Sequence, residues 1–358
     1  MNYITRIKLL REKMQELELD AFFTIDPVNF FYLTGFSGSS GAVLITQLDM
    51  FLLTDSRYET QALEETTKVP LELIIHKGPL LGELHMMIEN IKPKSVGFEP
   101  DRITYGQHHM ISSQTTKFIP VEELIANIRK TKEQAELVAM KKAIIVVETA
   151  FTDMLTYVQV GMTEAMLAAK LEMQMKQLGS SGTSFDTIVA SGIRGALPHA
   201  HPTDKKLVSG EFITIDFGAK IDGYCSDMTR SFALGTPSSS SMVTIYNTVL
   251  AAQKKATAAI SEGLKTADID KIARDIITTA GYGANFGHGL GHCIGIEVHE
   301  FPRLSPLDES ILESGMVVTI EPGIYVENLG GIRIEDMVLV KKDGNENLMS
   351  LPKELIIV

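Results

Sequence analysis

Residues 212–230, FITIDFGAKIDGYCSDMTR, place two carboxylates inside runs that otherwise have the pattern of strand interiors. Burying one unpaired carboxylate is costly. Burying Asp216 and Asp227 near each other without a cation is costlier still, because like charges cannot both stay ionised in a dry site. We therefore expect a positive charge to lie between them.

The dipeptide Asp222-Gly223 in this stretch indicates a two-residue hairpin turn, because such a turn needs positive φ at both positions. With that turn, residue 216 would lie opposite residue 229. Since side chains alternate with period two, Asp216 and Asp227 would then share one face of the sheet. A longer loop would shift the register.

A second candidate hairpin, MVVTIEPGIYVENLGGIRIEDMVLV, has its turn near residues 328–331 and supplies two more strand carboxylates, Glu321 and Glu335. Between the two hairpins lies GHGLGHCIGIEVHE, whose glycines let the backbone approach a ligand closely and whose three histidines are His288, His292 and His299. Two Asp, two Glu and one His would form a bridged two-metal site with mostly hard oxygen ligands, suited to Mn²⁺ and tolerant of Co²⁺ or Zn²⁺. Each acid alone could be a solvated strand end, but that explanation does not cover all five residues together.

The charge balance limits the partners. The chain has 33 Lys and Arg against 45 Asp and Glu, a formal net charge of -12, and no long basic run that could follow a phosphate backbone. We expect no nucleic-acid partner and no membrane span, and the charged N-terminus lacks the apolar core of a signal peptide. Cys225 and Cys293 are interpreted as ordinary buried thiols in a reducing compartment. The expected location is therefore cytoplasmic.

The 358-residue length and the 44% hydrophobic content predict two domains. Residues 1–128 contain a helix and five short strand patterns, AFFTID, GAVLIT, MFLLTDSRY, LELIIH and SVGFE, which indicate a small α/β domain. Residues 129–358 begin with a long amphipathic helix and continue as an α+β domain. Four serines in GTPSSSSM are interpreted as capping a helix over residues 239–261.

Three motifs resemble those of the metallopeptidases with the pita-bread fold, namely IDFGAKIDGYCSDMTR, GHGLGHCIGIEVHE and EPGIYVENLGGIRIED. The resemblance extends through SGIRGALPHAHPTDKK and implies a pita-bread catalytic domain over residues 129–358. In addition, NFFYLTGFSGSSGAVLIT and LLTDSRYETQA resemble the creatinase-like N-terminal domain of aminopeptidase P and prolidase, which residues 1–128 would form. Methionine aminopeptidase lacks that domain, so this resemblance argues against it.

Carried over motif by motif, the resemblance implies five metal ligands, Asp216, Asp227, His292, Glu321 and Glu335. Glu321 would also shuttle a proton. His199, in ALPHAHP, and His299 would flank the scissile bond and stabilise the developing tetrahedral intermediate. A metal-bridging water, with its pKa lowered, would supply hydroxide near neutral pH.

The same resemblance implies substrate-pocket roles for His288 and Tyr325, and a supporting contact from Arg333 to the ligand carboxylates. His201 matches no such role and is interpreted as a surface-loop histidine. Cys293 directly follows a proposed ligand, and we interpret it as a small buried residue rather than a metal ligand.

The expected substrates are small proline-containing peptides, and the expected assembly is a homodimer. We predict an Xaa-Pro aminopeptidase, which TDSRYETQA slightly favours, with an Xaa-Pro dipeptidase (prolidase) as the alternative. A creatinase-type hydrolase works without metal, and the five ligand matches speak against it. A non-catalytic peptide-binding protein on the same fold is disfavoured because no ligand is missing.

Overall fold

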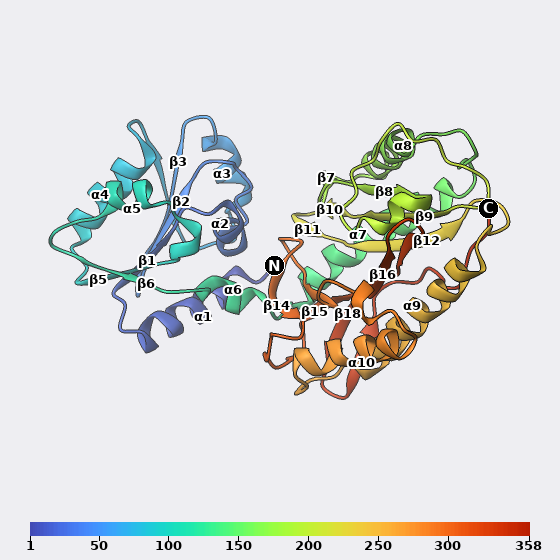
Figure 1. Ribbon diagram of the computed structural model, residues 1–358. Helices are drawn as coiled ribbons and strands as arrows, with labels where there is room; N and C mark the ends of the chain where they lie inside the picture. The colour runs from blue at the N-terminus through green and yellow to red at the C-terminus, as the bar shows by residue number, and fades with distance from the viewer. The chain divides into compact units, whose positions relative to one another are not determined.

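The computed structural model describes residues 1–358. The chain forms two compact units, Met1–Arg129 and Lys130–Val358 (Figure 1). The division between them falls one residue after the boundary expected from the sequence. Each unit has its own hydrophobic core.

The first unit is an α/β sandwich around one six-stranded sheet with the order β4-β3-β2-β1-β5-β6. The β1–β2 and β2–β3 pairs are antiparallel, and the other neighbours are parallel. The five predicted strands are present, and β6 is an additional one. The elements are α1 (Tyr3–Glu16), β1 (Ala21–Thr24), α2 (Pro27–Thr34), β2 (Ala42–Thr46), β3 (Met50–Asp55), α3 (Glu59–Glu65), β4 (Glu72–His76), α4 (Leu80–Ile91), β5 (Ser95–Phe98), α5 (Tyr105–Ile111), β6 (Lys117–Pro120) and α6 (Leu124–Arg129).

The second unit has four long helices, α7 (Gln134–Met154), α8 (Glu164–Gln177), α9 (Ser240–Ala259) and α10 (Thr266–Thr279). They pack in two sequential pairs, with α8 on one side of the strands and α9 and α10 on the other (Figure 1). The prediction that serines cap a helix here is confirmed at α9, where the Ser239 side chain accepts a hydrogen bond from the main-chain N–H of Met242. None of the helices in the chain combines the length and apolar character needed to cross a membrane.

The strands of this unit form several small sheets, of which three carry the site: β12-β9-β8, β14-β13-β15-β18-β19 and β16-β17. The strands are β7 (Gly182–Thr183), β8 (Ile188–Ser191), β9 (Phe212–Phe217), β10 (Ala219–Ile221), β11 (Tyr224–Cys225), β12 (Met228–Ala233), β13 (Gly291–Cys293), β14 (Glu300–Leu304), β15 (Val317–Ile320), β16 (Gly323–Val326), β17 (Gly330–Arg333), β18 (Asp336–Lys341) and β19 (Gly344–Asn347).

The first predicted hairpin has the expected register. Asp216 pairs with Thr229, and the turn residues Asp222 and Gly223 have φ of 51° and 85°. The β9–β12 ladder and the β10–β11 ladder keep this register on either side of an interruption. Asp227 lies in that interruption, which corrects the expectation that it sits inside a strand.

The second hairpin has the same design. The β15–β18 and β16–β17 ladders share one register, and the connection contains Asn328 and Gly330 at φ of 61° and 140°. Glu321 follows β15, and Glu335 lies between β17 and β18 rather than within a strand as expected. Each hairpin therefore interrupts its ladder where it presents Asp227 or Glu335, whereas Asp216 lies within the regular strand β9.

Candidate active site

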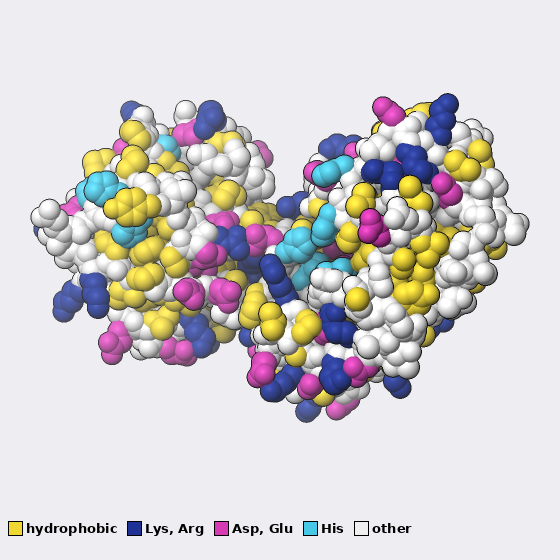
Figure 2. Space-filling model, viewed as in Figure 1, with side chains coloured by type: hydrophobic (Ala, Val, Ile, Leu, Met, Phe, Trp, Pro, Cys, Tyr) yellow, Lys and Arg dark blue, Asp and Glu magenta, His cyan; other side chains and the backbone are white.

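Nine of the ten site residues expected from the sequence line a single cavity of about 580 Å³ in the second unit. Histidine side chains gather on this face of the unit (Figure 2). His201, interpreted as a surface-loop residue, is exposed and also contributes to the cavity wall. The nine are His199, Asp216, Asp227, His288, His292, His299, Glu321, Arg333 and Glu335.

The floor of the cavity is a cluster of buried acids around one imidazole. Ligand atoms of Asp227, His292 and Glu335 all lie within 4.8 Å of one another. His292 Nε2 lies 3.3 Å from Glu321 Oε1 and 3.7 Å from Asp227 Oδ2. The two hairpins and β13 therefore converge on one point, although Asp227 and Glu335 are 108 positions apart in the chain.

Two of these acids have one oxygen fixed and one oxygen left over. Arg333 Nη2 donates to Asp216 Oδ2 at 2.6 Å, and Thr229 Oγ1 donates to Glu335 Oε2 at 2.6 Å. The other oxygens, Asp216 Oδ1 and Glu335 Oε1, are buried without a hydrogen-bond partner. Since buried acceptors normally have partners, this donor set fits divalent cations held by carboxylate oxygens.

The pKa shifts of three acids in this cluster indicate that the site needs additional positive charge. Burial, and then the charge of Glu335, raise the pKa of Asp227 well above its ordinary value. Burial, and then the charge of Glu321, raise the pKa of Glu335 in the same way. Burial also raises the pKa of Asp216, although Arg333 opposes the effect. The chain alone does not provide enough cations for these acids to stay ionised together.

His292 is oriented by a main-chain contact. Its Nδ1 lies 3.0 Å from the carbonyl oxygen of Cys293, which can only accept, so Nδ1 carries the hydrogen. The opposite nitrogen, Nε2, is therefore the one directed at Glu321 and Asp227. This is the usual way in which a second hydrogen bond presents an imidazole to a metal.

Tyr325 lies behind the cavity wall and links two site residues. Arg333 Nη1 donates to the Tyr325 hydroxyl at 2.7 Å, and that hydroxyl lies 3.0 Å from His288 Nε2. His288 Nδ1 is 2.7 Å from the carbonyl oxygen of Gly289 and thus donates to it. It follows that Tyr325 donates to Nε2 of a neutral His288, in agreement with the lowered pKa that burial gives this histidine.

The loop that carries His199 is held by Glu164, which the sequence analysis missed. This fully buried carboxylate accepts hydrogen bonds from Ser191 N and Oγ (both 2.8 Å), from Arg194 Nε (2.9 Å), and from Thr203 N and Oγ1 (3.2 and 2.8 Å). It thereby joins both ends of the loop. In the sequence Glu164 is an ordinary acid in the first turn of a helix, so no local signal distinguishes it.

Arg303 on β14 is a second residue that the sequence analysis missed. It is exposed, lines the cavity, and its guanidinium forms no ion pair or side-chain hydrogen bond within the chain. It follows the exposed His299 by four residues, and its charge is among the influences that lower the pKa of His299, after burial and His292. The sequence alone could have suggested this residue, because Arg303 lies four positions after the candidate histidine His299.

Two family models match this chain. Residues 138–342 match metallopeptidase family M24, and residues 6–131 match the creatinase/prolidase N-terminal domain. The chain belongs to metallopeptidase family M24. The resemblance seen in the three motifs, and the expected pita-bread fold with a creatinase-like N-terminal domain, are thereby confirmed.

Three relatives of this M24 chain span nearly its whole length. An Xaa-Pro dipeptidase of Pyrococcus horikoshii is 36% identical and covers 98% of both chains. The solved Xaa-Pro dipeptidase from Bacillus anthracis is 38% identical, with a TM-score of 0.96 and complete coverage of both chains. The solved X-Pro aminopeptidase from Thermotoga maritima is 38% identical, with a TM-score of 0.90, and covers 97% of this chain and 100% of that one.

Proposed function

We propose that the chain is a metal-dependent dipeptidase that cleaves the bond between an N-terminal residue and proline. The observation that carries the proposal is the cavity, in which the acid and histidine cluster is accompanied by Arg303, a cation without a partner in the chain. The proline of a free dipeptide bears a carboxylate, and a guanidinium binds a carboxylate well. In a longer peptide that position is an uncharged amide.

The relatives also support a dipeptidase over the aminopeptidase predicted from the sequence. Several of them bear the name Xaa-Pro dipeptidase or prolidase. The stretch TDSRYETQA no longer favours an aminopeptidase, because relatives named for either activity align over nearly the whole chain, including the N-terminal unit. The aminopeptidase stays as a second candidate because of the Thermotoga maritima relative.

The proposed ligands of two divalent cations are Asp216, Asp227, His292, Glu321 and Glu335. We propose Mn²⁺ first, with Co²⁺ and Zn²⁺ as alternatives, because oxygen ligands predominate. When bound, such cations supply a nucleophile at neutral pH and polarise the scissile carbonyl.

The remaining residues bind the substrate and move its protons. Glu321 takes a proton from the attacking water on its carboxylate and passes it to the proline nitrogen, which carries no hydrogen in the substrate, as the C–N bond breaks. His199 and His299, both on the exposed wall of the cavity, donate to the oxygen on which negative charge develops. His288, held by Tyr325, and Arg333 keep the wall and the acid cluster in place.

The test is hydrolysis of Ala-Pro and of Ala-Pro-Ala by chelator-treated protein with and without Mn²⁺. We expect metal-dependent cleavage of Ala-Pro and much slower cleavage of the tripeptide. Preferential cleavage of the tripeptide would replace the proposal with the aminopeptidase. If neither peptide is cleaved under any metal condition, a peptide-binding role is the better explanation.

A homodimer and a cytoplasmic location complete the proposal. The first is tested by light scattering after size-exclusion chromatography, where a monomer with full activity would contradict it. The second is tested by cell fractionation. Neither result would alter the assignment of the cavity.

A further inference from the structure

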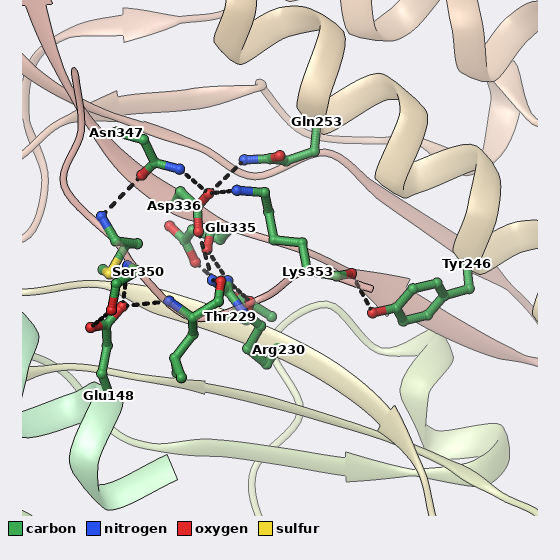
Figure 3. A network of polar contacts seen from close by, with 12 residues as sticks. Glu148, Thr229, Arg230, Tyr246, Gln253, Glu335, Asp336, Asn347, Ser350 and Lys353 are labelled. Atoms are coloured by element: carbon green, nitrogen blue, oxygen red, sulfur yellow. Dashed lines mark hydrogen bonds and ion pairs between the residues drawn. The ribbon is translucent and has the colours of Figure 1, made fainter. Parts of the chain in front are cut away.

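A second charge cluster lies directly behind the proposed ligand Glu335, around its neighbour Asp336 (Figure 3). Asp336 is fully buried. Arg230 Nη2 donates to its Oδ1 at 2.7 Å, and Lys353 Nζ donates to its Oδ2 at 2.5 Å. Asn347 and Gln253 also donate to Oδ2, at 2.7 and 3.3 Å. Two cations and two amides therefore meet on one carboxylate.

Arg230 connects this cluster to the acids of the cavity. Its Nη1 donates to the carbonyl oxygens of Glu335, at 2.5 Å, and of Thr229, at 3.0 Å. Thr229 in turn donates its hydroxyl to Glu335 Oε2, and the Glu335 N–H donates to the Thr229 carbonyl at 3.1 Å. The guanidinium thus joins the two hairpins at the point where Glu335 projects, and Figure 3 shows these contacts together.

Lys353 comes from the irregular C-terminal segment, residues 348–358. Its carbonyl oxygen accepts a hydrogen bond from the Tyr246 hydroxyl at 2.8 Å, which anchors the main chain there. One residue further on, Glu354 forms an exposed ion pair with Lys254 on α9. The segment therefore offers one lysine contact into the interior and, beside it, one at the surface.

The second cation changes what Arg230 can do. Arg230 divides its donors between the Asp336 carboxylate and the main-chain oxygens of Glu335, Thr229 and Leu351, the last at 3.2 Å. Without Lys353, Asp336 Oδ2 would have only two amide donors, and the buried carboxylate would attract the guanidinium more strongly. That attraction would compete with the contacts that hold Glu335 in place.

We propose that Lys353 is a positioning residue for the metal site, so that the C-terminal segment contributes to metal affinity through Asp336 and Arg230. The inference rests on the proposed metal site. Partners of this kind typically change metal affinity 10- to 100-fold when removed, and Lys353 acts through two intermediate residues. We therefore expect an effect at the lower end of that range.

The experiment is calorimetric titration of Mn²⁺ into the chelator-treated, full-length protein. Lys353→Met is expected to raise the Kd by about 10-fold. Lys353→Arg, which keeps the positive charge, is expected to recover most of the affinity. The matched control is Lys254→Met, which removes the surface contact of the same segment and should leave the Kd unchanged.

The outcomes separate this inference from the metal site itself. If the unaltered protein binds Mn²⁺ and Lys353→Met binds it equally well, with only a lower Tm, Lys353 is merely structural and the inference fails. A Lys254→Met variant that loses as much affinity would also overturn it, since any loosening of the segment would then suffice. If the unaltered protein does not bind Mn²⁺, the proposed metal site fails and the inference fails with it. Should Lys353→Met not fold, the Kd of Lys353→Gln decides by the same criteria.

Discussion

The second unit buries two sets of carboxylates and surrounds them differently. The framework acids, Glu164 and Asp336, are fully buried. Both carboxylate oxygens of each acid accept hydrogen bonds from the chain, and each acid accepts at least one from a cationic side chain. The pocket acids share one histidine and one arginine, and two of their oxygens have no partner. The pocket acids are Asp216, Asp227, Glu321 and Glu335.

This difference separates two uses of buried charge. A carboxylate that fixes the architecture must be neutralised by the protein itself, because an uncompensated buried charge destabilises the fold. A carboxylate intended for a cation must keep an oxygen available, and it remains electrostatically unsatisfied until the cation binds. Glu335 and Asp336 show this contrast within one dipeptide.

The largest expected effect is on activity at a pocket acid. Glu335→Gln should lower the kcat for Ala-Pro with Mn²⁺ by on the order of 10²–10³-fold or more, the size seen when one preorganised electrostatic group is removed. In chelator, its free energy of unfolding in urea should be unchanged or higher, because a buried carboxylate with one unpartnered oxygen is removed. A large loss of stability in chelator would place Glu335 among the framework acids.

The next effect is on stability at the adjacent framework acid. Asp336→Asn should lower the free energy of unfolding by about 3–5 kcal/mol, because the buried Arg230 and the half-buried Lys353 would lose their counter-charge. Urea denaturation in chelator measures this without any contribution from metal binding. Glu354→Gln, which removes an exposed pair of the same C-terminal segment, serves as the control. Similar losses in the two variants would contradict the contrast.

The third prediction concerns Arg303 in the cavity wall. Arg303→Met should raise the KM for Ala-Pro by about 10- to 100-fold, since a hydrogen-bonded charge contact contributes about 1.5–3 kcal/mol. Ala-prolinamide, which has no terminal carboxylate, should be cleaved equally well by both proteins. If the substitution weakens binding of both substrates alike, Arg303 does not bind the terminal carboxylate of the substrate.

The smallest effect concerns the loop held by the other framework acid. Thr203→Val removes one of the hydrogen bonds to Glu164 and should lower kcat/KM about 5-fold, the equivalent of about 1 kcal/mol. In a His199→Ala background the same change should have little further effect, because the two act through one loop. Thr279→Val, which removes an exposed threonine hydrogen bond within α10 and leaves Glu164 and this loop unchanged, is the matched control. Additive losses would show that Glu164 does not act through His199.

Much of the site was predictable because its geometry is local. The Asp222-Gly223 turn and the two-residue alternation of a strand lead directly to the pairing of Asp216 with Thr229, and the structure confirms this register. The motifs also led to the family, which the comparisons confirm. The assignment of individual ligands and catalytic histidines stays a prediction, although these residues do line one cavity.

The missed residues depend on contacts between distant parts of the chain. Arg230 and Asp336 are 106 positions apart, and Glu164 reaches Thr203 across 39. Each of these residues, taken in its own segment, is an ordinary charged or polar residue. Arg303 differs, because its spacing from His299 suggested a place near the site. Only the folded structure shows that its guanidinium has no partner in the chain.

The two hairpins were predictable from a few neighbouring residues, because turn chemistry and side-chain alternation act locally, and the resemblance of three motifs led to the family and to the acids and histidines available for a metal. Contacts that form only in the folded chain settle which carboxylates are neutralised by its own cations and which keep an oxygen without a hydrogen-bond partner. The physical reason is that the cost of a buried charge depends on what lies around it in space, and for Asp336 those neighbours come from β12, α9, β19 and the C-terminal segment.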